Sequence, residues 1–134
     1  MSQQIESVLV IEAYQAIAQE ILAFVGKNSW DEAGATYEIF GKMISSTWWS
    51  KYNGELDQLG NDIPRDVSKL AKEKIYFLRK HLFDLTGDRI WGLNFTLYPT
   101  GKFNIQYNYN KPEGYEETDE FITGEEINKS FMQK

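Results

Sequence analysis

The sequence contains no cysteine, which excludes a disulfide scaffold and thiolate metal sites. Its one histidine, His81, has Phe77 and Leu85 one helical turn away on either side, so a general base or metal ligand is not indicated there. The glycines are scattered singly, and no glycine-rich phosphate loop or nucleophile elbow is present. We therefore expect a protein that is not an enzyme, needs no cofactor and binds no metal.

A basic excess is also absent, since the net charge is −6 at pH 7. Residues 1–112 carry 13 acidic and 12 basic side chains, whereas residues 113–134 carry 7 acidic and 2 basic ones, so the last segment holds −5 of the total. Nucleic-acid binding needs a basic face that neutralises phosphates, and we expect no such binding here. The charged partner that suits this chain is a basic protein.

No apolar stretch runs uninterrupted for the ~20 residues of a membrane span, because Glu12 and Glu20 break the first one. The opening stretch, MSQQIESVLVIEAY, has no basic residue ahead of its apolar run, which is not typical of a secretory signal. We expect no membrane partner and a cytoplasmic location. The length of 134 residues and the hydrophobic content of 42% predict one domain over 1–134 with a packed core.

Two segments have the apolar periodicity of helices. Residues 2–24 end at Gly26, which suits a helix stop, and residues 64–86 lie between Pro64 and Gly87. Between the two segments, aromatic and β-branched residues gather in two short runs that predict a hairpin turning at Gly41-Lys42 and closed by Asn53-Gly54. We read the polar stretch that follows, GELDQLGND, as a loop.

A second hairpin is predicted by IWGLNFTLYPTGKFNIQYNY, in which apolar odd positions alternate with polar even ones. The odd positions of both strands share one face only if the loop has three residues, Pro99 to Gly101. That register pairs Leu97 with Phe103 and puts Gly101 in the left-handed position of a bulged hairpin.

The predicted order of elements is therefore α-β-β-α-β-β. We expect an α+β fold of two layers, an antiparallel sheet with the helices packed on one face. The other face would carry neutral polar side chains, and it is either solvated or receives a partner. These side chains are Asn94, Thr96, Asn104, Gln106 and Asn108.

Adjacent Trp48 and Trp49 must point to opposite faces of their strand. One of them packs under the helices and the other lies on the polar face, and the sequence does not decide which. The outward tryptophan is either an interface anchor, as tryptophan often is at binding hot spots, or an edge residue covered by a loop.

The C-terminal segment, residues 111–134, mixes its acids with Tyr115, Phe121 and further apolar residues, which a purely solvating tail would lack. Anchored in this way, it would present a fixed negative patch that steers a basic partner; the alternative is a solvated tail. The candidate partner-binding residues are Tyr115, Glu116, Glu117, Asp119 and Glu120, with Asn108, Tyr109 and Trp48 as their neighbours.

The stretch GDRIWGLNFTLYPTGKFNIQYNYNKPEGY resembles the YezG-like immunity proteins, which neutralise bacterial nuclease toxins deployed between competing cells. The resemblance lies in the strand containing Trp91, the turn at Gly101-Lys102-Phe103 and the alternation up to Tyr109 ahead of an acidic loop. It implies a stoichiometric inhibitor without catalytic residues. Such an inhibitor would bind the C-terminal domain of a contact-dependent or polymorphic toxin in the cytoplasm, covering its active site or another surface that the toxin needs.

Two other function classes stay open. A small-ligand or enzymatic domain would use the space between helices and sheet, with Tyr76, Arg79 and His81 as the obvious polar donors. An adaptor domain would dimerise through its polar sheet face or a strand edge. The sequence fixes neither the identity of the toxin nor the oligomeric state.

Overall fold

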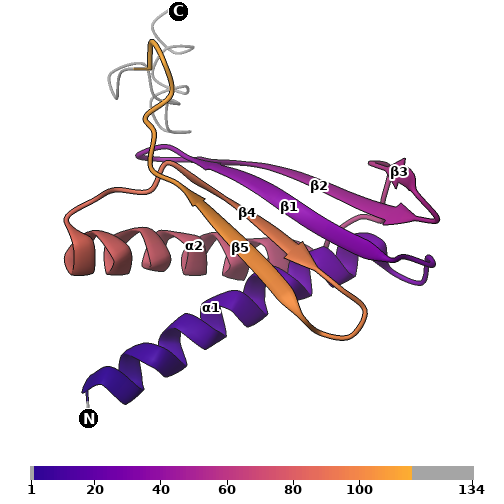
Figure 1. The fold of residues 1–134 in the computed structure, drawn as a ribbon, viewed down its shortest axis with the longest axis horizontal. Coiled ribbons are helices and arrows are strands. Elements are labelled where there is room, and N and C mark those ends of the chain that lie inside the picture. The colour runs from indigo at the N-terminus through magenta and orange to yellow at the C-terminus, as the bar shows by residue number, and fades with distance from the viewer. Residues whose placement is uncertain (1, 116–134) are drawn as a thin grey trace, which may run out of the picture.

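The computed structural model describes residues 2–115 and confirms the α+β fold. Its two helices are α1 (Ser2–Val25) and α2 (Arg65–Thr86). Its strands are β1 (Glu32–Ile39), β2 (Ile44–Tyr52), β3 (Glu55–Asp57), β4 (Gly92–Leu97) and β5 (Phe103–Asn108). They form one sheet in the order β3-β2-β1-β4-β5, with every neighbouring pair antiparallel. Both helices lie on the same side of this sheet (Figure 1).

The core lies between α1 and the inner face of the sheet, because one stripe of α1 is apolar at helical spacing. Ile17 and Ile21 of this stripe are fully buried together with Tyr37 of β1 and Phe95 of β4. Helix α2 packs mainly on α1 through Ala71, Ile75 and Leu78. Within residues 2–115, helices cover only this one face of the sheet.

The helix ends lie where the glycines predict them. Gly26 follows α1 with a φ of 60°, and Gly87 follows α2 with a φ of 79°, a region that glycine enters without the cost of a Cβ. The Asn61 side chain also caps α1, since its amide donates to the carbonyl oxygens of Phe24 at 3.2 Å and Val25 at 3.1 Å. This cap attaches the loop ahead of α2 to the end of α1.

Strand β3 corrects the prediction that residues 54–62 form a loop throughout. Asn53 and Gly54 both have positive φ, 52° and 80°, the combination of a tight two-residue hairpin turn. The turn folds the chain back so that Leu56 pairs with Lys51 at the sheet edge. The observed order of elements is α-β-β-β-α-β-β.

The second hairpin has the predicted register. Leu97 pairs with Phe103 and Phe95 with Ile105, and Gly101 has a φ of 91°. The first hairpin also turns at the predicted point, where the Phe40 amide donates to the Met43 carbonyl at 2.9 Å. In the second hairpin the side-chain alternation decided which residues face the helices.

Among the described residues one stretch of α1, Ser7–Val25, is long and apolar enough to cross a membrane by length and composition alone. Core helices of soluble proteins and signal sequences pass the same test. In this fold the stretch supplies Ala13, Ile17, Ile21 and Phe24 to the core.

Candidate partner-binding surface

The two adjacent tryptophans lie on opposite faces of the sheet, as their spacing requires. Trp48 faces the helices, where its ring stacks on Phe24 with centroids 6.3 Å apart and its Nε1–H donates to Glu20 Oε1 at 3.1 Å. The outward tryptophan is therefore Trp49. Trp48, which we had grouped with the partner-binding residues, lies on the helix-covered face instead.

Glu20 is a fully buried carboxylate at the centre of the interface between helix and sheet. Its Oε1 accepts hydrogen bonds from the Tyr37 hydroxyl at 2.5 Å and from the Trp48 indole. Burial, and next the charge of Glu20, raise the pKa of the Tyr37 hydroxyl well above its ordinary value. The helix α1 and strands β1 and β2 are therefore joined by a buried polar contact as well as by apolar packing.

The face of the sheet that points away from the helices is called the open face below. Its orientation follows from the strand register, since each outward residue has an outward partner on the next strand. Along β1 it presents Thr36 and Glu38, both exposed. The neighbouring strands add mostly neutral polar side chains, among them Ser45, Thr47, Asn94, Thr96, Asn104, Gln106 and Asn108.

Trp49 lies near the centre of the open face, directly over Gly34 of β1. The two residues are register partners, and a Cβ at position 34 would lie 2.6 Å from Trp49 Cζ2. Glycine is thus required for the indole to lie this low on the sheet. The Lys51 ammonium lies 5.6 Å from the centre of the Trp49 ring and 3.8 Å from Glu32, at one side of the aromatic surface.

Asn108 and Tyr109 lie where β5 leaves the sheet. Asn108 is exposed, its carbonyl accepts the Trp91 amide at 2.7 Å, and its Oδ1 accepts the Asn110 amide at 3.0 Å. Tyr109 is 45% exposed. Both candidates are therefore accessible at this end of the sheet.

Tyr115 anchors the start of the acidic segment to the folded domain. Its ring lies 5.0 Å from Phe40, just after β1, and 5.8 Å from Trp91, just before β4. Glu116, Glu117, Asp119 and Glu120 lie outside the described residues. The acids thus begin directly after a residue that packs at the same end of the sheet as Asn108.

Two arginines lie at this end of the sheet; from the sequence Arg79 was considered only as a polar donor of a ligand site, and Arg89 was not considered. Arg79 of α2 donates to the Phe40 carbonyl at 2.7 Å, and the Arg89 guanidinium lies 3.8 Å from the centre of the Trp91 ring. Phe40 and Arg79 are 39 residues apart in the chain, so only the tertiary fold brings these two together. The one sequence signal was the spacing of Arg89 and Trp91, which places a cation two residues from an aromatic ring.

The polar donors considered for a ligand site are engaged in ring contacts. His81 stacks on Phe77 with centroids 5.4 Å apart, and Tyr76 lies under the Arg79 guanidinium at 4.9 Å. Within residues 2–115 no group of three or more histidine, aspartate or glutamate side chains is placed to hold a metal ion.

No protein-family model matches the chain, and no curated protein matches it. The resemblance to the YezG-like immunity proteins stays a prediction. The candidate binding surface consists of the open face, the Tyr115 anchor and the charged residues around them.

Proposed function

We propose that this protein is an immunity protein, a stoichiometric inhibitor that binds and neutralises a cognate bacterial toxin. The observation that carries the proposal is the open face, with Trp49 at its centre and a strongly acidic segment that starts at its end. The partner is the basic C-terminal domain of a toxin, of the nuclease class by the resemblance of the second hairpin. The protein acts in the cytoplasm and performs no chemistry of its own.

One partner surface is large enough to cover Trp49 and the start of the acidic segment together. Trp49 pairs with Gly34, and the row that contains Glu38 and Asn108 lies four residues further along β1. At about 3.3 Å per residue this is about 13 Å. A standard interface buries about 800 Å² on each partner and easily spans that distance.

The two parts of this surface have different tasks. An aromatic ring supported by a rigid sheet contributes affinity, because a tryptophan buried at an interface centre is often a hot spot. The acids of residues 113–134 contribute long-range attraction, which raises the association rate of a basic partner at low salt. A nuclease that binds phosphates carries the positive charge that such an attraction needs.

The first test is genomic: we expect a gene for a large secreted protein with a variable C-terminal domain immediately upstream. The second test is co-expression with that C-terminal domain. We expect the toxin domain alone to stop growth, and this protein to restore growth and co-purify with it at a 1:1 ratio. Trp49→Ala should abolish the rescue. Leu70→Ala, which alters a half-exposed apolar side chain on α2, is the matched control and should keep it.

Failure to rescue and to co-purify would contradict the proposal. Rescue by Trp49→Ala at the level of the parent protein would retain the inhibitor but remove the open face as its binding surface.

A further inference from the structure

The two edge strands of the sheet differ in length and in charge. Strand β3 is three residues long and carries Glu55 and Asp57, and a short, charged edge resists pairing with another strand. Strand β5 is six residues long and has no charged side chain and no proline. It pairs with β4 along one edge, and within residues 2–115 no strand covers its other edge. The sheet can therefore accept a further strand at the free edge of β5.

The hydrogen bonds at both ends of β5 show which of its peptide groups face this free edge. The carbonyls of Lys102 and Asn108 accept from the amides of Tyr98 and Trp91, so even-numbered residues direct their peptide groups toward β4. Successive residues of a strand alternate in this respect. The odd-numbered residues therefore direct their amides and carbonyls to the free edge. They are Phe103, Ile105 and Tyr107.

Helix α1 extends beyond the free edge of β5. It crosses the sheet from β2 to β5, since Phe24 stacks on Trp48 while the Tyr14 hydroxyl hydrogen-bonds to that of Tyr107 at 2.9 Å. Ahead of Tyr14 the helix continues to Ser2 (Figure 1). At a rise of about 1.5 Å per residue, about 18 Å of helix therefore projects past β5.

The projecting part of α1 and the inward side of β5 form an apolar shelf below the free edge. Val8 and Ile11 of the helix are 53% and 52% exposed. Phe103 is 47% exposed, although its ring stacks on Phe95 with centroids 5.1 Å apart, and Tyr107 is half-buried. A strand added at β5 would bring its own inward side chains onto this shelf, because paired residues of neighbouring strands lie on the same face.

We propose that the β5 edge and the apolar shelf receive an extended strand of the partner, with apolar side chains facing the shelf and basic side chains on the other face. This inference rests on the proposed function, in which the partner is a basic toxin domain. The net charge of −6 favours basic side chains on the partner, and the uncharged β5 favours apolar ones at the shelf. Backbone hydrogen bonds would supply affinity, and the alternation of side chains would supply selectivity.

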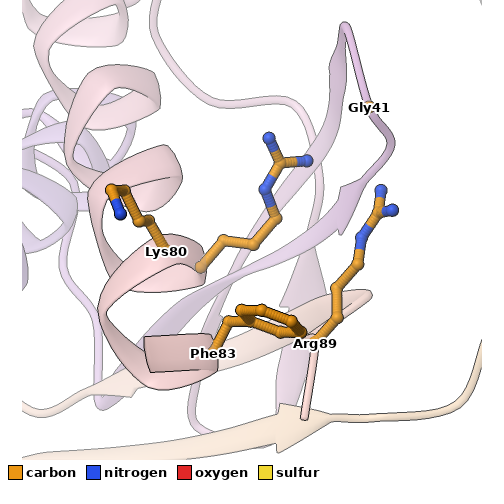
Figure 2. A pocket seen from close by; sticks show the side chains of 5 residues that line it. Gly41, Lys80, Phe83 and Arg89 are labelled. Carbon is orange, nitrogen blue, oxygen red and sulfur yellow. The ribbon is translucent and has the colours of Figure 1, made fainter. Parts of the chain in front are cut away.

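Two observations select this occupant and this place. A second copy that extended the sheet at β5 would bring its own projecting α1 beneath the same two strands, whereas a single strand leaves that space to one helix. The pocket between α2 and the turn at Gly41 does not suit a basic partner, because its lining includes the cationic side chains of Arg79, Lys80 and Arg89 (Figure 2).

Binding of a synthetic strand to the free protein tests the proposal without the toxin. The probe is the peptide Ac-KVKVKVK-NH2, whose valines would pair with the odd-numbered residues of β5. Amide hydrogen exchange is followed by NMR at Phe103, Ile105 and Tyr107. With the peptide at about ten times its dissociation constant, exchange at these amides should slow about tenfold. The amides of Asn104 and Gln106, which face β4, should change little.

A matched control peptide has N-methylated valines, so it keeps the charge and the side chains but loses the N–H groups that would pair with β5. It should give no protection. Ile105→Pro removes one amide from the free edge, where proline is tolerated, and should weaken binding of the first peptide about tenfold. Ile105→Val keeps this amide and should bind the peptide as the parent does.

Edge amides that exchange as slowly as Asn104 and Gln106 before any peptide is added would overturn the proposal, because the edge would already be occupied in the free protein. Equal protection by the N-methylated peptide, or protection by neither peptide, would also overturn it. Growth rescue by a protein that does not bind the peptide would retain the inhibitor and remove the added strand, so the two proposals fail separately.

Discussion

Trp48 and Trp49 are neighbours in the chain, yet they belong to different parts of the molecule. Trp48 stacks on Phe24 and donates to a buried carboxylate, so the fold accounts for both its ring and its N–H group. Trp49 rests on Gly34 on a face that no described helix covers. Trp48 therefore helps to hold the helix and the sheet together, whereas Trp49 is displayed on the sheet surface.

The same division applies to the charged residues. Glu20 is buried and accepts two hydrogen bonds within the core, whereas Glu32 and Glu38 lie on the open face. Changes on the helix-covered face should therefore alter stability first. Changes on the open face should alter binding while the protein stays folded.

The largest effect on stability is expected from Glu20→Ala. It leaves the Tyr37 hydroxyl and the Trp48 indole without their acceptor in the core, and each buried unsatisfied donor costs about 1–3 kcal/mol. We expect the free energy of unfolding to fall by about 3 kcal/mol in urea denaturation. Glu12→Ala is the control on the same helix: its carboxylate is half exposed, 3.6 Å from Lys74, and its loss should cost less than about 1 kcal/mol. If Glu20→Ala and Glu12→Ala lose the same free energy of unfolding, the buried carboxylate is no more important for stability than the exposed one.

The tryptophans themselves should differ next. Trp48→Ala removes a ring that packs in the core and should lower the free energy of unfolding by about 2 kcal/mol, less than for a fully buried aromatic. Trp49→Ala removes a ring that rests on the sheet surface and should cost about 1 kcal/mol. Thermal and urea unfolding of both variants check the order. A Trp49→Ala variant less stable than Trp48→Ala would show that the open face is part of the core.

A smaller effect is expected at alkaline pH. The pKa of Tyr37 is raised in the folded state, so the folded protein keeps this proton after the unfolded chain has released its own. Stability is therefore fully present below about pH 10 and falls above it, by about 1.4 kcal/mol per pH unit for this one group. Tyr37→Phe should cost about 1 kcal/mol at pH 7 through the lost hydrogen bond and flatten the alkaline decline.

Urea denaturation repeated between pH 8 and 11 measures this slope. Burial also raises the pKa of Tyr107, next to Tyr14, so part of the decline should persist in Tyr37→Phe. If the free energy of unfolding of Tyr37→Phe falls between pH 8 and 11 as steeply as that of the parent protein, Tyr37 does not keep its proton in the folded state.

The parts of the fold that could be predicted are those with a strong periodic signal. Alternation along the second hairpin determined its register, because a shift by one residue would move every apolar side chain to the other face. Strand β2 gave no such signal. Its inward positions include Ser46 and Ser50, so the side of Trp48 could not be assigned from alternation.

Other features depend on contacts between distant segments. Strand β3 is exposed along its whole length and has no apolar pattern, although Asn53-Gly54 marks the turn that forms it. Glu20 was taken as an interruption of an apolar run, and only the fold shows that its Oε1 accepts hydrogen bonds from Tyr37 and Trp48. The hydrogen bond from Arg79 to the Phe40 carbonyl joins α2 to a residue 39 positions earlier in the chain.

The central claim is that the open face and the acidic segment together form one binding surface, and the kinetics of association with the toxin domain test it most directly. Surface plasmon resonance at several salt concentrations compares the parent, Trp49→Ala and an amide variant. The amide variant combines Glu116→Gln, Glu117→Gln, Asp119→Asn and Glu120→Gln. We predict that Trp49→Ala dissociates about 30-fold faster, as for a hot spot of about 2 kcal/mol, with its association rate little changed. We predict that the amide variant associates more slowly and with a weaker salt dependence, with its dissociation rate little changed. Association and dissociation rates equal to those of the parent in both variants would contradict the claim.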